Sequence, residues 1–291
     1  MYSAISANKR NTVIIMIVFL LIIGGLGWLA GAVYRSYVVT VVVVVIAAIY
    51  ALVQFFAASR LAMAVNGGHE IQKKDAPEVY RLVENLTIAT GLPMPRIFII
   101  DDPAPNAFTT GRNPDNAMLA VTTGLLEIMD KREVEAVLAH EISHVKNYDI
   151  LVNMVVFGLV SAIGMLCDLF LRMTFFGRNS RDNNNQIMLV FGLVAMILAP
   201  IVAMLVQLAV SRQREYLADA SGVLTTRDPE GLAMALEKLK TASQPMRRQN
   251  SSTAHLWFAN PMKSGFLAKL FSTHPPLDDR IKRLRENATK M

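Results

Sequence analysis

His140-Glu141-Ile142-Ser143-His144 places two imidazole side chains four residues apart, with a carboxylate directly after the first. On an α-helix, residues four apart lie on one face, about one turn from each other. Two histidines at this spacing can bind one metal ion, and Glu141 then stands beside a water molecule on that ion. The stretch predicts a helix, a metal centre and a general base.

The flanking sequence predicts that the stretch is helical. Asp130 can cap a helix that begins at Lys131, and Glu133 stands where it completes a capping box. No Gly or Pro interrupts residues 131–150, so the helix is expected to continue through them. The apolar residues recur at helical spacing, namely Val134, Val137, Leu138, Ile142 and Val145. The motif is the H-E-x-x-H arrangement of zinc peptidases, which requires this helix.

Catalytic zinc sites usually have three protein ligands, so a third is expected outside the motif. Glu215, in the stretch Ser211-Arg212-Gln213-Arg214-Glu215-Tyr216-Leu217-Ala218-Asp219, is the best candidate. Asp219 follows four residues later on the same helical face and can accept a hydrogen bond from a ligand histidine. His69 and His255 are expected at the surface. Taken alone, the stretch also fits an ordinary charged helix beside a membrane.

Composition indicates membrane segments. Of 291 residues 53% are hydrophobic, and the mean hydropathy is +0.37. The single cysteine, Cys167, excludes a disulfide within the chain. The net charge is +6, and its excess lies in residues 210–291, where aromatic residues are sparse. This basic excess fits a membrane-facing or solvated surface, and no nucleic-acid partner is expected.

Four long apolar runs lie at residues 12–33, 37–58, 150–171 and 187–210. Each is long enough to cross a hydrocarbon core of about 30 Å as a helix. The first run lacks a cleavage site at the right distance and is followed at once by the second, so it is expected to be a retained anchor. Lys9 and Arg10 precede it and favour a cytoplasmic N-terminus.

The runs divide the chain into four expected parts. Residues 1–58 form a transmembrane hairpin, and residues 59–149 form the first part of a catalytic domain. Residues 150–210 form a second transmembrane or membrane-embedded hairpin, and residues 211–291 form the second part of the catalytic domain. His144 precedes the third run and Glu215 follows the fourth. Because these two residues must meet on one metal ion, the third and fourth runs must begin and end on the same side of the membrane. Between the first hairpin and the motif, the pattern predicts a helix after Pro77 and strands at 96–100 and 118–122, with another strand within 106–111.

HEISH at 140–144, SRQREYLAD at 211–219 and THPP at 273–276 together resemble the HtpX family of membrane zinc metalloproteases. This family is related to the type I CAAX prenyl proteases. The resemblance covers nearly the whole chain, including the apolar runs and Asn106-Ala107-Phe108-Thr109-Thr110-Gly111. It implies a mainly α integral membrane protein with four transmembrane helices and a zincin-like α+β metalloprotease domain that holds a small sheet.

The resemblance also implies roles for individual residues. His140, His144 and Glu215 would bind one zinc ion per chain, Glu141 would be the catalytic base, and Asp219 would orient a ligand. His274 would support the oxyanion of a tetrahedral intermediate; the alternative is a turn histidine held by the two prolines that follow it. Asn106, Ala107, Phe108 and Thr109 would form an edge strand to which substrate adds, or else a plain core strand. Arg212 would pair with Asp219 or with substrate carbonyls, or remain a solvated charge.

The expected function is that of a zinc metalloendopeptidase of the bacterial cytoplasmic membrane, with its active site facing the cytoplasm. By resemblance, its substrates would be misfolded or damaged membrane proteins in a stress response. A CAAX-type prenyl-peptide protease would use the same chemistry but has more membrane spans. A catalytically silent adaptor would not need Glu141. A transporter would need more polar groups within the apolar runs.

Overall fold

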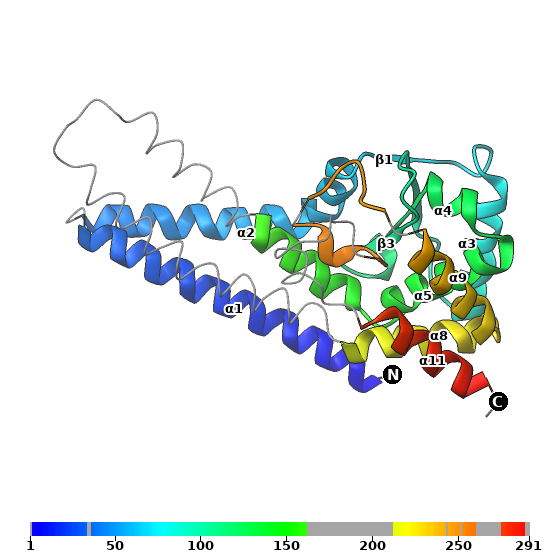
Figure 1. Ribbon diagram of the computed structural model, residues 1–291. Coiled ribbons are helices and arrows are strands. Elements are labelled where there is room, and N and C mark those ends of the chain that lie inside the picture. Colours follow the sequence, from blue (N-terminus) through cyan, green and yellow to red (C-terminus); the bar gives the residue numbers. More distant parts are fainter. Residues whose placement is uncertain are drawn as a thin grey trace.

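The computed structural model describes residues 2–33, 36–161, 212–242, 244–250, 252–259 and 275–288. Two long helices project side by side from a globular part that holds a small sheet and the remaining helices (Figure 1). The molecule is mostly helical, as expected from the sequence.

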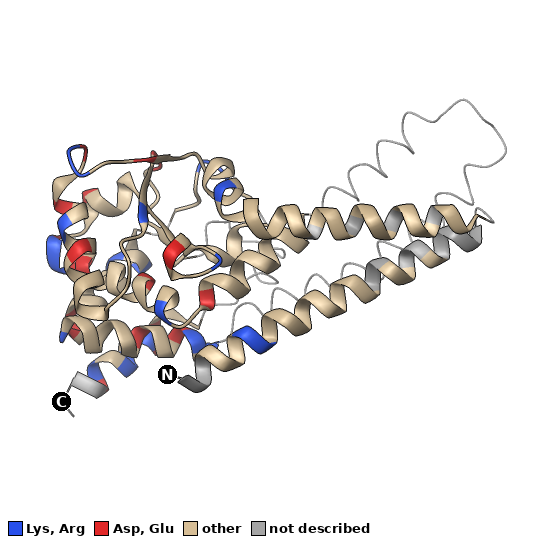
Figure 2. Cartoon of the chain, turned by 180° about the vertical axis from the view of Figure 1, so that it is seen from behind, with Lys and Arg blue, Asp and Glu red and all other residues tan. Residues whose placement is uncertain are grey.

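The first two apolar runs form the projecting helices α1, Tyr2–Val33, and α2, Tyr37–Val65. Figure 2 shows charged residues on the globular part and at the adjoining ends of both helices, and none marked along their outer portions. Large apolar side chains are exposed along both helices, among them Val13, Ile17, Leu21 and Trp28 of α1 and Val41, Ile46, Ile49 and Phe56 of α2. The outer portions therefore bury little of their apolar surface within the chain.

The described helices support only some of the expected transmembrane segments. Among the described residues, no single helix passes a test of length and hydropathy for crossing a bilayer, whereas two segments of α2, Thr40–Tyr50 and Leu52–Val65, together pass it. Of the third apolar run, the structure describes only the part within the helix Asp149–Ser161. The fourth run, at 187–210, lies outside the described residues.

The sheet has the strand order β1-β2-β4-β3, with β2 parallel to β4 and the other two pairs antiparallel. Strands β2, Arg96–Ile100, and β4, Met118–Thr122, have the predicted bounds. Strand β3, Ala107–Thr110, lies at one edge. Strand β1, Gly68–Glu70, is not predicted by the sequence, because glycine is unfavourable in strands.

Helix α3, Pro77–Thr90, begins where the sequence predicts. Proline stands in its first turn, and Gly91 caps its end with φ +69°, a left-handed conformation that glycine adopts without a steric penalty. Its apolar face is buried through Val79, Leu82, Val83 and Leu86. Helix α4, Thr123–Ile128, was not predicted; the Thr122 hydroxyl caps it by accepting from the Leu125 amide.

Helix α5, Lys131–Lys146, carries the histidines and has the predicted capping box between Asp130 and Glu133. The expected continuation through residue 150 is wrong. The chain leaves the helix at Asn147, adopts φ +61° at Tyr148 and starts a new helix at Asp149. A tyrosine in the left-handed conformation is uncommon and needs support from its surroundings. Asn8 and Lys9 of α1 supply this support through contacts with Asn147 and Tyr148.

Helices α8, Arg212–Thr226, and α9, Pro229–Thr241, pack beside α5, and α11, Leu277–Ala288, lies against them (Figure 1). A β-carbon at Gly222 of α8 would lie 3.0 Å from the His140 backbone nitrogen. Glycine there lets α8 approach the backbone of α5 closely, which brings Glu215 to the histidines. Two short 3-10 helices, η1, Pro114–Asn116, and η2, Ala254–Leu256, complete the described elements.

Candidate metal centre and active site

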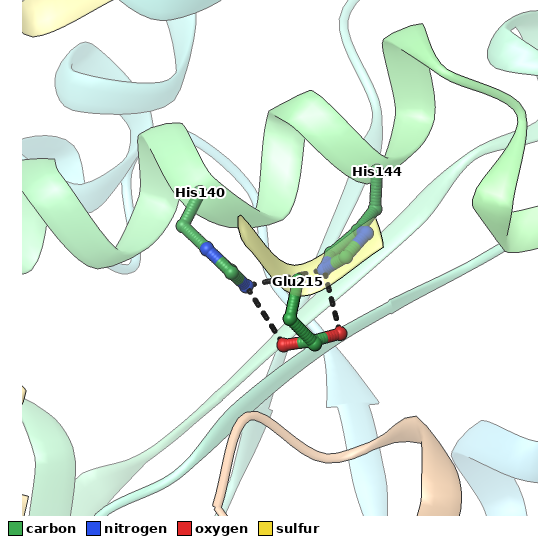
Figure 3. A group of neighbouring side chains, drawn as sticks. All are labelled: His140, His144 and Glu215. Carbon is green, nitrogen blue, oxygen red and sulfur yellow. Dashed lines mark hydrogen bonds and ion pairs between the residues drawn. The ribbon is translucent and has the colours of Figure 1, made fainter. Parts of the chain in front are cut away.

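Helices α5 and α8 bring three side chains together that are far apart in the sequence. His140 and His144 project from successive turns of α5, and Glu215 of α8 faces both (Figure 3). The Nε2 atoms of the two histidines are 3.1 Å apart. Each lies 3.7 Å from one carboxylate oxygen of Glu215. All three residues are buried, so the group forms a closed triangle of ligand atoms inside the protein.

Carboxylates behind the histidines determine which ring nitrogens face this triangle. The Nδ1 atom of His140 lies 2.8 Å from Asp219 Oδ1, and Nδ1 of His144 lies 2.9 Å from Asp149 Oδ2. A carboxylate only accepts, so each Nδ1 donates its proton. In the neutral rings both Nε2 atoms then carry lone pairs that point at one another and at the carboxylate of Glu215. Such a convergence of acceptors is stable around a cation.

The spacing and chemistry of the triangle fit zinc. With metal–ligand distances of about 2.0–2.2 Å in a tetrahedral site, neighbouring ligand atoms lie about 3.3–3.5 Å apart. The observed separations, 3.1 Å and twice 3.7 Å, bracket that value. Two imidazoles and one carboxylate are also a ligand set of catalytic zinc, which leaves a fourth position for water or substrate. These residues are therefore suited to hold the ion.

Glu141 lies beside the triangle and is held by the edge strand. The Thr109 hydroxyl donates to Glu141 Oε2 at 2.9 Å. Both residues are buried, and both line a small cavity together with the three candidate ligands. Residues one apart on a helix differ by about 100° in direction, so Glu141 approaches the cavity from the side of β3. A carboxylate in this place can exchange protons with a reactant in the cavity.

Asp219 is held by a buried arginine that sequence reasoning missed. Arg280 of α11 has no exposed surface and forms two hydrogen bonds to Asp219, at 2.7 and 2.9 Å. Its Nη1 lies 3.9 Å from Glu215, and its guanidinium is 4.8 Å from the Phe258 ring centre. Burial raises the pKa of Asp219, but the charge of Arg280 and the hydrogen bonds from His140 and Arg280 outweigh it and lower the pKa to about 2. Asp219 is thus an anion that orients His140.

His144 is surrounded by negative charge. Burial alone lowers the pKa of His144, but the Asp149 hydrogen bond and the charges of Glu215, Asp149 and Glu141 outweigh it and raise the pKa to about 9. The site therefore favours a cation at this imidazole, whether a proton or a metal ion. Asp149, the first residue of the helix that follows α5, is a direct partner of the candidate ligand His144.

Residues 254–259 close the cavity on one side. Its lining includes His255, Trp257 and Phe258, and the expectation that His255 lies at the surface is wrong, because it is only 2% exposed. The His255 Nε2 atom is 3.2 Å from the Asn153 carbonyl oxygen. Phe258 packs edge-on against the His140 ring at 4.8 Å. His69, in contrast, is exposed as expected.

The same segment contacts the outer side of β3. The Phe258 amide donates to the Ala107 carbonyl at 2.8 Å, and the Asn106 side chain exchanges hydrogen bonds with the Ala259 backbone at 2.8 and 2.9 Å. Backbone groups alternate in direction along a strand. Thr109, two residues beyond Ala107, therefore turns its backbone groups to the same outer side, next to Glu141.

Of the roles expected for Arg212, the structure supports a solvated charge rather than a pair with Asp219. Arg212 is exposed on α8, and Arg280 rather than Arg212 binds Asp219. Arg280 follows the THPP stretch by four residues, and no local pattern distinguishes it from the other basic residues of α11. His274 lies outside the described residues, so its proposed role stays a prediction.

Comparisons with known proteins agree with this arrangement. Residues 73–288 match the family model described as peptidase family M48. The chain is 54% identical over 286 residues to a protease HtpX homolog of Tropheryma whipplei (strain Twist), with 98% of each chain covered. It is 43% identical over 296 residues to a protease HtpX homolog of Streptococcus gordonii, covering 98% of this chain and 99% of that one.

Among solved structures, the fold is similar to the crystal structure of S. mikatae Ste24p, with a TM-score of 0.51 and 19% sequence identity. The match covers 98% of this chain and 67% of that chain. At this identity the likeness concerns the fold alone.

Proposed function

The chain belongs to peptidase family M48, and on that premise we propose that it is a zinc-dependent endopeptidase of the bacterial cytoplasmic membrane that cleaves misfolded or damaged membrane proteins. The observation that carries the proposal is the convergence of His140, His144 and Glu215 beside the carboxylate of Glu141. Family membership supports a protease, and the ligand triangle supports zinc as its metal.

Peptide-bond hydrolysis requires a polarised carbonyl, a deprotonated water and a proton donor for the leaving amine. Zinc held by His140, His144 and Glu215 would polarise the carbonyl and lower the pKa of the attacking water. The Glu141 carboxylate takes the proton of that water and passes it to the leaving nitrogen. The Thr109 hydroxyl holds this carboxylate in place during both transfers. Asp219 and Asp149 keep the two imidazoles turned toward the reacting groups.

The edge strand β3 is the proposed binding surface for substrate. An extended peptide that pairs with the outward backbone groups of Thr109 would pass directly beside Glu141. Phe258 and Ala259 already bond to Ala107 and Asn106, the neighbouring part of this edge. A substrate that extends past Ala107 must therefore displace residues 258–259. A need for extended chains favours unfolded polypeptides over folded ones.

The projecting helices support a membrane location. Exposed apolar side chains along α1 and α2 are costly in water and stable in lipid. Lys9 and Arg10 lie near the start of α1, where the Lys9 ammonium is 4.4 Å from the centre of the Tyr148 ring in the globular part. By the positive-inside rule, these two cations support a cytoplasmic location for that part. The active site would then face the cytoplasm close to the membrane surface.

The decisive test compares Glu141→Gln with the wild-type full-length protein in detergent. Glu141→Gln should retain about one zinc ion per chain and lose cleavage of casein and of an unfolded membrane protein. Glu135→Gln, the same change on the same helix outside the cavity, is the control and should remain active. Full activity of Glu141→Gln would sink the mechanism. If the wild-type protein cleaves a prenylated peptide in preference to casein, its substrate is of the CAAX type. If the wild-type protein binds zinc and cleaves neither, it is an adaptor.

A further inference from the structure

Asp149 reaches His144 only because the helix breaks between them. In a continuous helix, residues five apart differ by about 140° around the axis, so Asp149 would point away from His144. The structure instead ends α5 at Lys146, turns at Tyr148 with φ +61° and begins a new helix at Asp149. The turn brings Asp149 Oδ2 to 2.9 Å from His144 Nδ1. The geometry of a candidate zinc ligand thus depends on a strained turn.

Asn8 of α1 holds both sides of that turn. Its side-chain amide donates to the Asn147 carbonyl at 2.9 Å and to Asp149 Oδ1 at 2.7 Å. Asn8, Asn147 and Asp149 are all buried, with 4% or less of their surface exposed. The Lys9 ammonium lies 4.4 Å from the centre of the Tyr148 ring, a cation–π distance that supports the tyrosine in its unusual conformation.

Both oxygens of the Asp149 carboxylate are therefore used. Oδ2 accepts from His144 and Oδ1 accepts from Asn8, while Arg214 of α8 lies 3.9 Å from Oδ1. A buried carboxylate with a hydrogen-bond donor on each oxygen has one favourable orientation, because rotation would break both bonds. Removing the Asn8 amide keeps the His144 bond to Oδ2 but leaves Oδ1 with the 3.9 Å contact to Arg214, so the carboxylate is held less firmly.

We infer that Asn8 is a positioning residue of the metal centre. It orients Asp149, which in turn holds His144 with the Nε2 lone pair aimed at the metal. The inference rests on the zinc site proposed above. Asn8 precedes residues 73–288, the part that matches the family model, so α1 contributes to the centre from outside that part. The packing of α1 against the turn at residues 147–149 is thereby linked to the affinity for zinc.

The test measures zinc affinity by competition with a chelator, on the full-length protein in detergent. All variants carry Glu141→Gln, which leaves the three candidate ligands intact and prevents self-cleavage. Asn8→Leu has a similar size and no donor, and it should weaken zinc binding about 10- to 100-fold, as changes to groups behind metal ligands typically do. In cobalt-substituted protein the visible absorption bands should shift, because the orientation of His144 changes. Asn8→Ala, a smaller change, should act in the same direction if Asn8→Leu does not fold.

The matched control is Thr12→Val, one turn further along α1. The Thr12 hydroxyl is buried and, among the described residues, bonds only within α1, to the Asn8 carbonyl at 2.9 Å, so its loss should leave zinc affinity unchanged. In an Asp149→Ala background, Asn8→Leu should have no further effect, because Asn8 acts through Asp149. Unchanged affinity in Asn8→Leu, or equal weakening by Thr12→Val, overturns the inference. If the parent protein itself binds no zinc, the proposed function fails instead.

Discussion

The guanidinium of Arg280 donates two hydrogen bonds to the carboxylate of Asp219, with Nη2 2.7 Å from Oδ1 and Nε 2.9 Å from Oδ2. Asp219 Oδ1 also accepts the hydrogen bond from His140 Nδ1. One fully buried arginine thus anchors the carboxylate that orients a candidate zinc ligand. Helix α11 therefore supports the candidate metal centre.

Replacing Arg280 should damage both stability and metal binding. Arg280→Leu leaves the buried Asp219 carboxylate without its cation, and removing one partner of a buried pair costs about 3–5 kcal/mol. Arg280→Lys retains the charge but loses the paired hydrogen bonds, so its effect should be smaller. Thermal unfolding with and without zinc measures the change. Unaltered melting and zinc affinity in Arg280→Leu would contradict this role.

Thr109→Val should lower turnover without removing the metal. The valine has nearly the same shape and lacks the hydroxyl that holds Glu141. We expect kcat to fall roughly tenfold, equivalent to about 1.4 kcal/mol, with zinc content unchanged. Thr110→Val is the matched control, since the Thr110 hydroxyl is buried with no hydrogen-bond partner among the described residues. Equal loss of activity in both variants would indicate general damage to β3.

Zinc binding should release a proton from His144. Its pKa of about 9 in the metal-free protein lies above the ordinary value of 6.5, so the imidazole is protonated at neutral pH and must lose that proton to bind metal. Zinc affinity should therefore rise about tenfold per pH unit and level off near pH 9. Dye-monitored proton release in weakly buffered solution at pH 7.5 should show about one proton per zinc from this residue. Affinity independent of pH would argue against the raised pKa.

The raised pKa of His144 also determines how the stability of the metal-free protein changes with pH. Because the folded pKa of His144 exceeds the unfolded one, its contribution to stability is complete below about pH 6.5. The contribution is lost as the pH rises through about 9. Denaturant unfolding of the metal-free protein at pH 6 and pH 9.5, with Asp149→Asn as a comparison, measures it. The variant should show the smaller loss, since its amide does not attract the proton as a carboxylate does.

Gly222→Ala should separate the two helices that carry the ligands. The added methyl would lie 3.0 Å from the His140 nitrogen and 3.2 Å from the Ala139 carbonyl carbon, both backbone atoms that cannot rotate away. We expect a loss of about 1–3 kcal/mol in stability and weaker zinc binding, because Glu215 moves with α8. Gly24→Ala, whose methyl meets no atom of the described part of the chain within 4 Å, is the control and should be harmless. Wild-type zinc affinity in Gly222→Ala would show that the close approach is dispensable.

Much of the scaffold could be predicted because it depends on neighbours in the sequence. The capping box at Asp130 and Glu133, and the strand bounds at 96–100 and 118–122, follow from residue type and periodicity. The extent of α5 could not be predicted in this way. Nothing between Lys131 and Ile150 is a helix breaker, and the break at Tyr148 is stabilised by Asn8 and Lys9, which lie in another helix.

The sequence by itself determined the chemistry of the centre: two histidines one helical turn apart, a carboxylate beside the first, and a second stretch with Glu215 and Asp219 at helical spacing. Spacing along one helix is a local property, so it can be read without the fold. Only the tertiary structure decided which side chains hold these groups in place. Arg280 meets Asp219 across 61 residues and Asn8 meets Asp149 across 141, and the burial that makes these contacts strong exists only once the helices have packed.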